Sequence, residues 1–145
     1  MERSCRQQAH IDAPVEVVWE LLGDPNRHPE WWPKTLETNC ADIEQGCRYR
    51  AVMSGPMGRQ EEHEMLIETL EGCREVSISC EGTGVSTRFE LTGAQGGTFV
   101  DGWFGVEPES LGMKAFAAVA GRRYLAAWLQ SSLAGLKSAA EQVPA

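Results

Sequence analysis

The stretch IDAPVEVVWELLGDPNRHPEWWP, residues 11–33, predicts the end of a strand, a short amphipathic helix and a second helix bracketed by prolines. The side chain of Asp12 is of a kind that accepts hydrogen bonds from the free amides of a helix start, and Pro14 is tolerated in a first helical turn. Gly23 favours the end of the same helix. We therefore expect a helix from Pro14 to Leu22, followed by a second helix tipped with paired tryptophans.

The first of these helices has one apolar face. Its large apolar residues recur at three- and four-residue spacing, and they are Val15, Val18, Trp19 and Leu22. Glu16 and Glu20 fall beside this stripe. Because residues at this spacing lie on one side of an α-helix, the pattern predicts that this side is buried.

This segment and the end of the chain together carry a family resemblance. The matching residues are Ala13-Pro14, Val18-Trp19, Leu21-Leu22, Asp24-Pro25, Trp31-Trp32-Pro33, Leu133, Leu136-Lys137 and Glu141. They resemble the START-like (SRPBCC) superfamily, the helix-grip fold of Bet v 1 allergens, lipid-transfer domains and bacterial polyketide cyclase/dehydrase-type proteins. The resemblance covers residues 1–145 as one ligand-binding domain. It implies a shared internal cavity but no common catalytic motif.

Composition and charge limit the partners that we expect. The 145 residues are enough for one domain with a substantial core. A net charge of -8, from 13 basic and 21 acidic residues, repels phosphate backbones and anionic membranes, so nucleic acid is not an expected partner. The apolar runs are too short to span a bilayer, and stable membrane insertion is not expected. The oligomeric state is left open between monomer and homodimer.

The five cysteines predict neither a disulfide framework nor a zinc site. Their number is odd and none forms a CxxC pair. The first residues lack the apolar run of a secretory signal, so we expect a cytoplasmic protein with reduced thiols. No two histidines share a short motif, and we predict no metal and no cofactor.

Glycine-rich breaks divide the middle of the chain into runs of strand length. With the first strand they predict seven strands, at residues 3–11, 36–44, 47–54, 60–70, 73–81, 85–92 and 98–106. From Ser110 to about Gln142 the composition is that of a helix, with a leucine stripe from Leu125 to Leu136. Gly121 lies inside this predicted helix, and the sequence is compatible both with a kink at Gly121 and with a straight helix. The predicted fold class is α+β: a curved antiparallel sheet in β-α-α-β6-α order, wrapped around a long C-terminal helix.

A curved sheet around a helix leaves space that side chains do not fill, so we predict a mostly apolar ligand pocket. The predicted ligand-binding residues are Trp31, Met53, Met65, Ile67, Ile78, Thr87, Phe89, Phe104, Phe116 and Trp128. His63 and Tyr49 are the candidate catalytic residues, because histidine exchanges protons near neutral pH and both share the inward parity of their strands. A structural role for His63 remains an alternative. His10 and His28 are interpreted as surface or turn residues.

Three functions are compatible with this pattern. The first is binding or carriage of a small hydrophobic molecule such as a lipid, polyketide or aromatic metabolite. The second, implied by the resemblance, is a cofactor-independent cyclase, aromatase or dehydratase in which His63 or Tyr49 handles protons. The third is a co-chaperone-like interaction domain, for which Trp103 is the one hint of an exposed apolar patch. A dry pocket would favour carriage, while His63 close to Tyr49, Asp101 or an arginine would favour catalysis.

Overall fold

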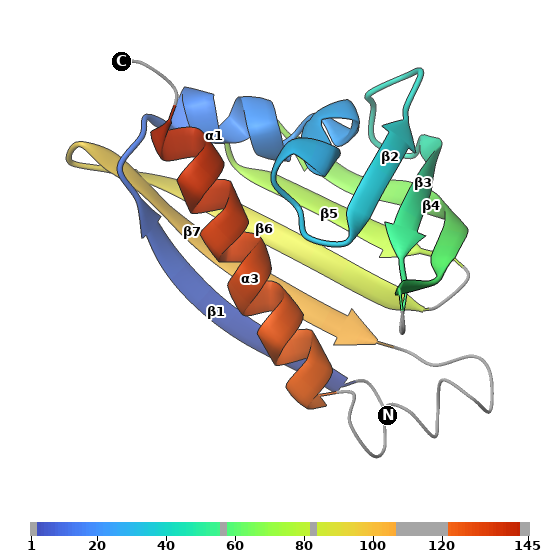
Figure 1. Cartoon of the computed structure of the whole chain (residues 1–145). Coiled ribbons are helices and arrows are strands. Elements are labelled where there is room, and N and C mark those ends of the chain that lie inside the picture. Colours follow the sequence, from blue (N-terminus) through green and yellow to red (C-terminus); the bar gives the residue numbers. More distant parts are fainter. Residues whose placement is uncertain (1–2, 56–57, 82–83, 107–121, 143–145) are drawn as a thin grey trace.

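A computed structural model describes residues 3–55, 58–81, 84–106 and 122–142. Seven strands form one antiparallel sheet in the order β1-β7-β6-β5-β4-β3-β2. They are β1 (Arg3–Ile11), β2 (Thr35–Asn39), β3 (Arg48–Ser54), β4 (Gln60–Glu71), β5 (Glu75–Cys80), β6 (Val85–Ala94) and β7 (Gly97–Val106). Two short helical segments and one long helix pack on the same face of this sheet (Figure 1). The α+β helix-grip fold predicted from the sequence is confirmed.

The glycine-rich breaks in the sequence predicted the strand positions well, with one clear difference at β2. We expected this strand at residues 36–44, but it ends at Asn39. The side chain of Asn26 accepts a hydrogen bond from the Cys40 amide and donates one to the Cys40 carbonyl, both at 2.9 Å. These bonds occupy the two backbone groups that a longer ladder would need, so pairing stops there.

The first helix, α1 (Val15–Leu22), begins one residue later than predicted, and Asp12 does not cap it. Pro14 occupies the N-cap position without a side-chain hydrogen bond. The Asp12 backbone amide instead donates to Glu141 at 2.8 Å, which ties the start of the chain to the end of the last helix. Gly23 ends α1 with φ of -84°, so it is not needed for a left-handed conformation. Glycine is required here because a Cβ at this position would lie 2.5 Å from the Trp19 indole.

The second helical segment, η1 (Pro25–Glu30), is a 3-10 helix. Asp24 provides its cap by accepting a hydrogen bond from the Asn26 amide at 2.9 Å. Pro29 lies inside it and has no amide proton to donate, which is compatible with a short helix and unfavourable for a long one.

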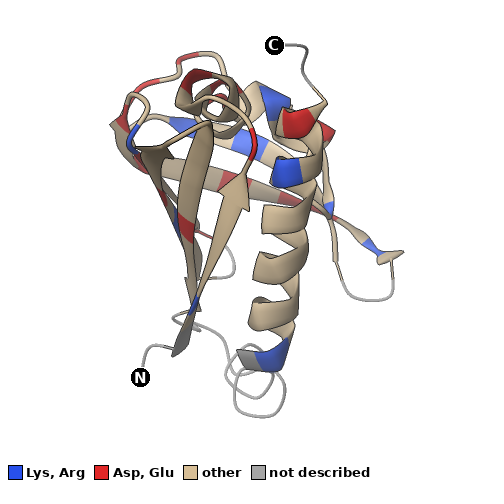
Figure 2. Cartoon of the chain, turned by 90° about the vertical axis from the view of Figure 1, so that its left-hand side faces the viewer, with Lys and Arg blue, Asp and Glu red and all other residues tan. Residues whose placement is uncertain are grey.

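The long helix α3 (Arg122–Glu141) packs mainly on β1 and β7 and reaches α1 with its far end. Its buried residues are the predicted stripe, Leu125, Leu129, Leu133, Leu136 and Ala140. Its charged residues lie near its two ends, and the middle carries none (Figure 2). The possible kink at Gly121 lies outside the described residues. No described helix is long and apolar enough to cross a membrane.

Trp103 lies on the outer face of the sheet, where the alternation of β7 places it. The Arg6 and Arg88 guanidinium groups lie 5.2 Å and 4.2 Å from the centre of its ring. Both arginines are its register partners on the neighbouring strands. Trp103 is therefore partly covered by charged groups.

Candidate functional site

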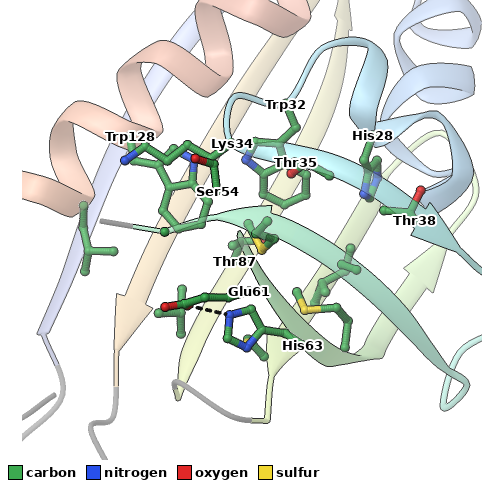
Figure 3. A pocket seen from close by; sticks show the side chains of 18 of the residues that line it. His28, Trp32, Lys34, Thr35, Thr38, Ser54, Glu61, His63, Thr87 and Trp128 are labelled. Carbon is green, nitrogen blue, oxygen red and sulfur yellow. Dashed lines mark hydrogen bonds and ion pairs between the residues drawn. The ribbon is translucent and has the colours of Figure 1, made fainter. Parts of the chain in front are cut away.

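A cavity of about 340 Å³ lies between the first turns of α3 and the part of the sheet that α3 does not cover (Figure 3). One wall comes from β3 and β4, whose register places Tyr49 opposite Met65, Ala51 opposite His63 and Met53 opposite Glu61. All six side chains line the cavity because alternate residues of a strand share one face. The volume lies within the range of small-molecule sites.

The other walls are mainly apolar. The inner strands contribute Ile78, Cys80, Val85, Thr87 and Val106. Above them lie Trp32, which follows η1, and Tyr124, Leu125 and Trp128 of α3. The Trp128 indole donates a hydrogen bond to the Pro33 carbonyl at 3.1 Å, which holds α3 against the segment that carries Trp32.

One acid–base pair lies in this wall. His63 Nε2 is 3.1 Å from Glu61 Oε2, and the two side chains are 16% and 40% exposed. The Glu61 carboxylate lies over Gly55, where an added Cβ would come within 2.9 Å of it. Figure 3 shows the two side chains pointing toward each other. A carboxylate at this distance can hold the imidazole in one orientation.

His28 lines the cavity beneath the tryptophans and is 1% exposed. Its Nε2 lies 2.9 Å from the Leu22 carbonyl oxygen, so this nitrogen carries the proton and donates. Burial lowers the pKa of His28 to about 4, which keeps the ring neutral near pH 7. Our prediction that His28 is a surface or turn residue is wrong. Its neighbours in sequence, Asn26, Arg27 and Glu30, are polar and suggested an exposed segment. The His28 ring instead packs against Trp31 and Trp32.

Lys34 and Tyr124 form a polar contact at another part of the wall. Lys34 Nζ lies 2.7 Å from the Tyr124 hydroxyl and 4.3 Å from the centre of its ring. Lys34 has a positive φ of 72°, which is uncommon outside glycine. This backbone conformation directly follows Pro33 and precedes β2. The contact links the start of β2 to the first turn of α3.

A sequence model described as polyketide cyclase/dehydrase and lipid transport matches residues 2–141. The chain belongs to the polyketide cyclase/dehydrase and lipid transport family. No protein in a search of curated sequences matches it significantly.

Solved structures similar to this family member share its fold. A protein of unknown function from Staphylococcus aureus is 15% identical, with a TM-score of 0.76 over 97% of this chain and 94% of its own. An AHSA1-like protein from Aeromonas hydrophila is 21% identical, with a TM-score of 0.71 over 96% and 92%. The di-domain ARO/CYC protein BexL from the BE-7585A biosynthetic pathway is 16% identical, with a TM-score of 0.73 over 99% of this chain and 51% of BexL.

Some of the predicted site residues of this polyketide cyclase/dehydrase family member come together in the cavity and others do not. The wall contains the predicted residues Tyr49, Met53, His63, Met65, Ile78, Thr87 and Trp128. The structure places Trp31, Ile67, Phe89 and Phe104 in the packed core, where each is at most 5% exposed. Trp31 faces α1, because its indole donates to the Leu21 carbonyl at 2.8 Å, and Trp32 takes the position at the cavity. Phe116 lies outside the described residues.

The two candidate catalytic residues line the cavity but are not partners. Tyr49 faces Met65 across the ladder, and burial raises the pKa of its hydroxyl, so the phenol stays protonated. His63 pairs with Glu61 instead. Asp101 accepts hydrogen bonds from Arg6 and Gln8 on the outer face of the sheet. Among the described residues, no group of three metal-binding side chains is present.

Glu61 was missed although the sequence held a signal for it. It shares the parity of His63 and Met65 on β4, and that parity was assigned to the inner face. Alternation alone would have separated Glu61 from Glu62 and Glu64.

Proposed function

We propose that the protein binds a small, largely apolar ring compound in the cavity between α3 and the sheet, and carries or sequesters it. The observation that supports this most is the cavity itself, whose exposed surface is mainly apolar. Methionines at positions 53 and 65 add side chains that adapt to different ligand shapes. The family name, which includes lipid transport, is consistent with carriage.

A bulky residue inside the cavity tests this proposal. Ala51 is 3% exposed and lines the wall, so Ala51→Phe should occupy ligand space. Native mass spectrometry of protein purified from its own host should show a retained small molecule with the wild type and not with A51F. The neutral fluorescent probe N-phenyl-1-naphthylamine should bind the wild type and lose at least about tenfold in affinity with A51F.

Ala127→Phe is the matched control, because Ala127 lies on the exposed side of α3. Its probe affinity should equal that of the wild type. Circular dichroism and thermal unfolding establish that both variants are folded. Equal probe binding by folded A51F and the wild type would contradict a role for this cavity.

The His63–Glu61 pair favours a second candidate function, proton transfer on a bound ketone. The imidazole would take a proton from the carbon next to a carbonyl, which gives an enolate and an imidazolium ion stabilised by the Glu61 carboxylate. An enolate is the nucleophile that an intramolecular carbon–carbon ring closure requires. In this step His63 would act as the general base and Glu61 as the partner that orients it.

Deuterium exchange measures this step without the natural substrate. Protein in D₂O should accelerate exchange at C2 of 1-tetralone, followed by proton NMR, because the enolate recaptures a deuteron. His63→Ala should lose about 100-fold or more of this acceleration, and Glu61→Gln less. Exchange that is unchanged in H63A would remove His63 from catalysis and leave the binding function intact.

A further inference from the structure

Two buried polar atoms in the cavity wall have no hydrogen-bond partner among the residues that the structure describes. They are Trp32 Nε1 and Thr87 Oγ1, and both side chains are 6% exposed. Buried polar groups are nearly always paired, because an unpaired one has lost its water without compensation. Both atoms belong to residues that line one cavity, which points to a ligand that pairs with them.

The neighbouring tryptophans show that this part of the structure can provide a hydrogen-bond acceptor for an indole N–H. Trp31 is stacked on Trp32 at 5.1 Å and donates to the Leu21 carbonyl. Trp128 lies 6.4 Å from Trp32 and donates to the Pro33 carbonyl. Within this group of three, Trp32 alone is buried with an unused N–H.

Thr87 occupies a position where an apolar residue would pack at least as well. In the sheet register it lies between Ile78 of β5 and Phe104 of β7. The Phe104 ring, which belongs to the packed core, in turn lies 6.3 Å from the Trp32 ring. Trp32 and Thr87 thus share an apolar neighbour, and both line the cavity (Figure 3). A hydroxyl in such a place destabilises the empty protein unless a ligand uses it.

The chemistry of the two groups limits what can pair with them. An indole N–H only donates, while a threonine hydroxyl donates or accepts. A charged group beside Ile78 and the rings of Trp32 and Trp128 would lose its hydration. A neutral oxygen acceptor on an apolar framework, such as a ketone carbonyl, satisfies both requirements.

We propose that Trp32 and Thr87 are specificity-determining residues, and that the cavity selects ring compounds bearing a neutral oxygen acceptor over hydrocarbons of the same shape. This inference rests on the proposed binding function and narrows its ligand class. The matched probes are 1-tetralone and tetralin, which share a bicyclic skeleton and differ in one carbonyl. Affinities are measured by titration of the ¹⁵N-labelled protein in proton–nitrogen NMR spectra.

We expect the wild type to bind 1-tetralone about tenfold more tightly than tetralin. The Trp32 indole N–H resonance, assigned with Trp32→Phe, should move downfield with the ketone and not with the hydrocarbon. Thr87→Val and W32F should each reduce the preference for the ketone severalfold. T87V should bind tetralin at least as well as the wild type does, because valine has the same shape as threonine.

Two control variants separate recognition from folding. Thr98 is also buried, but its hydroxyl donates to the Ala13 carbonyl at 2.8 Å and it lies outside the cavity wall. Thr98→Val should lower the melting temperature and keep the ketone preference, whereas T87V should not lower it. Trp31→Phe should likewise keep the preference.

The outcomes distinguish this inference from the function on which it rests. Equal affinities of the wild type for the two probes, or a ketone preference that survives in both T87V and W32F, would overturn the selection by Trp32 and Thr87 while binding itself stands. If neither probe binds and A51F has no effect on N-phenyl-1-naphthylamine, the binding function fails and the inference fails with it.

Discussion

The buried, neutral His28 makes the stability of the protein depend on pH. Burial is the main cause that lowers its pKa from 6.5 to about 4, against smaller opposing effects of the Leu22 carbonyl and the Asp24 carboxylate. As pH falls from 6.5 toward 4, the unfolded chain takes up a proton that the folded chain excludes. The stability associated with the neutral ring is therefore fully present above pH 6.5 and is lost as pH falls through this window.

The magnitude follows from the two pKa values. Each pKa unit corresponds to about 1.4 kcal/mol, so the complete loss below both values amounts to roughly 3 kcal/mol. Between pH 7 and pH 5 the same linkage gives a loss of about 2 kcal/mol, because the folded ring stays mostly unprotonated at pH 5. A loss of this size is a large part of the stability of a domain.

Urea unfolding at pH 7 and pH 5, followed by tryptophan fluorescence, measures the effect in the wild type and in His28→Gln. Glutamine keeps an N–H donor for the Leu22 carbonyl and does not titrate. We expect the wild type to lose about 2 kcal/mol more than H28Q between the two pH values. Hydrogen bonds from Arg27 and Lys137 lower the pKa values of Glu30 and Glu141. Protonation of these two carboxylates in acid also destabilises the fold, but it does so equally in the wild type and in H28Q. Parallel losses in the two proteins would refute this account of His28.

Three further predictions concern the scaffold. Gly135→Ala places a Cβ 2.2 Å from the Trp31 carbonyl oxygen, so it should lower the free energy of unfolding by about 2 kcal/mol despite the higher helix propensity of alanine. In the same thermal unfolding series Gly72→Ala, with nothing within 4 Å, should be neutral or stabilising. Asp24→Ala removes the cap of η1 and should cost about 1 kcal/mol, a melting temperature lower by a few degrees. Leu129→Ala removes a fully buried side chain and should cost about 2–5 kcal/mol in urea unfolding; a cost below about 1 kcal/mol would show that the core collapses around it.

The fold could be predicted from the sequence because its signals are local. Glycine-rich breaks separate the strands, and a period of two assigns their faces. The same period placed Met53, Met65 and Ile78 on the side of the sheet where the cavity lies. The β2 boundary could not be predicted, because it depends on the Asn26 side chain of a different element.

The site was harder to predict because alternation gives the face of a residue and not its distance from the helix. Ile67 has the same parity as Met65, yet it is fully buried in the core, two positions farther along β4. The burial of His28 could not be predicted for a different reason. η1 is too short and irregular for a helical period to show which side is buried. Its role depends on rings brought together by the fold.

Side-chain size along β7 determines how closely α3 approaches the sheet. Gly102 lets α3 come close, since a Cβ at this position would lie 2.9 Å from the Leu129 side chain. Two residues farther along the same face, the Phe104 ring packs edge-on against Trp128 at 5.0 Å and occupies the space between strand and helix. The helix is therefore close to β7 at Gly102, and within the same turn the rings of Phe104 and Trp128 lie between helix and strand. α3 packs mainly on β1 and β7, and among the described residues no helix packs extensively on the inner faces of β3, β4 and β5. The apolar cavity lies over this part of the sheet, where β3, β4 and β5 contribute Tyr49, Met65 and Ile78 to its wall.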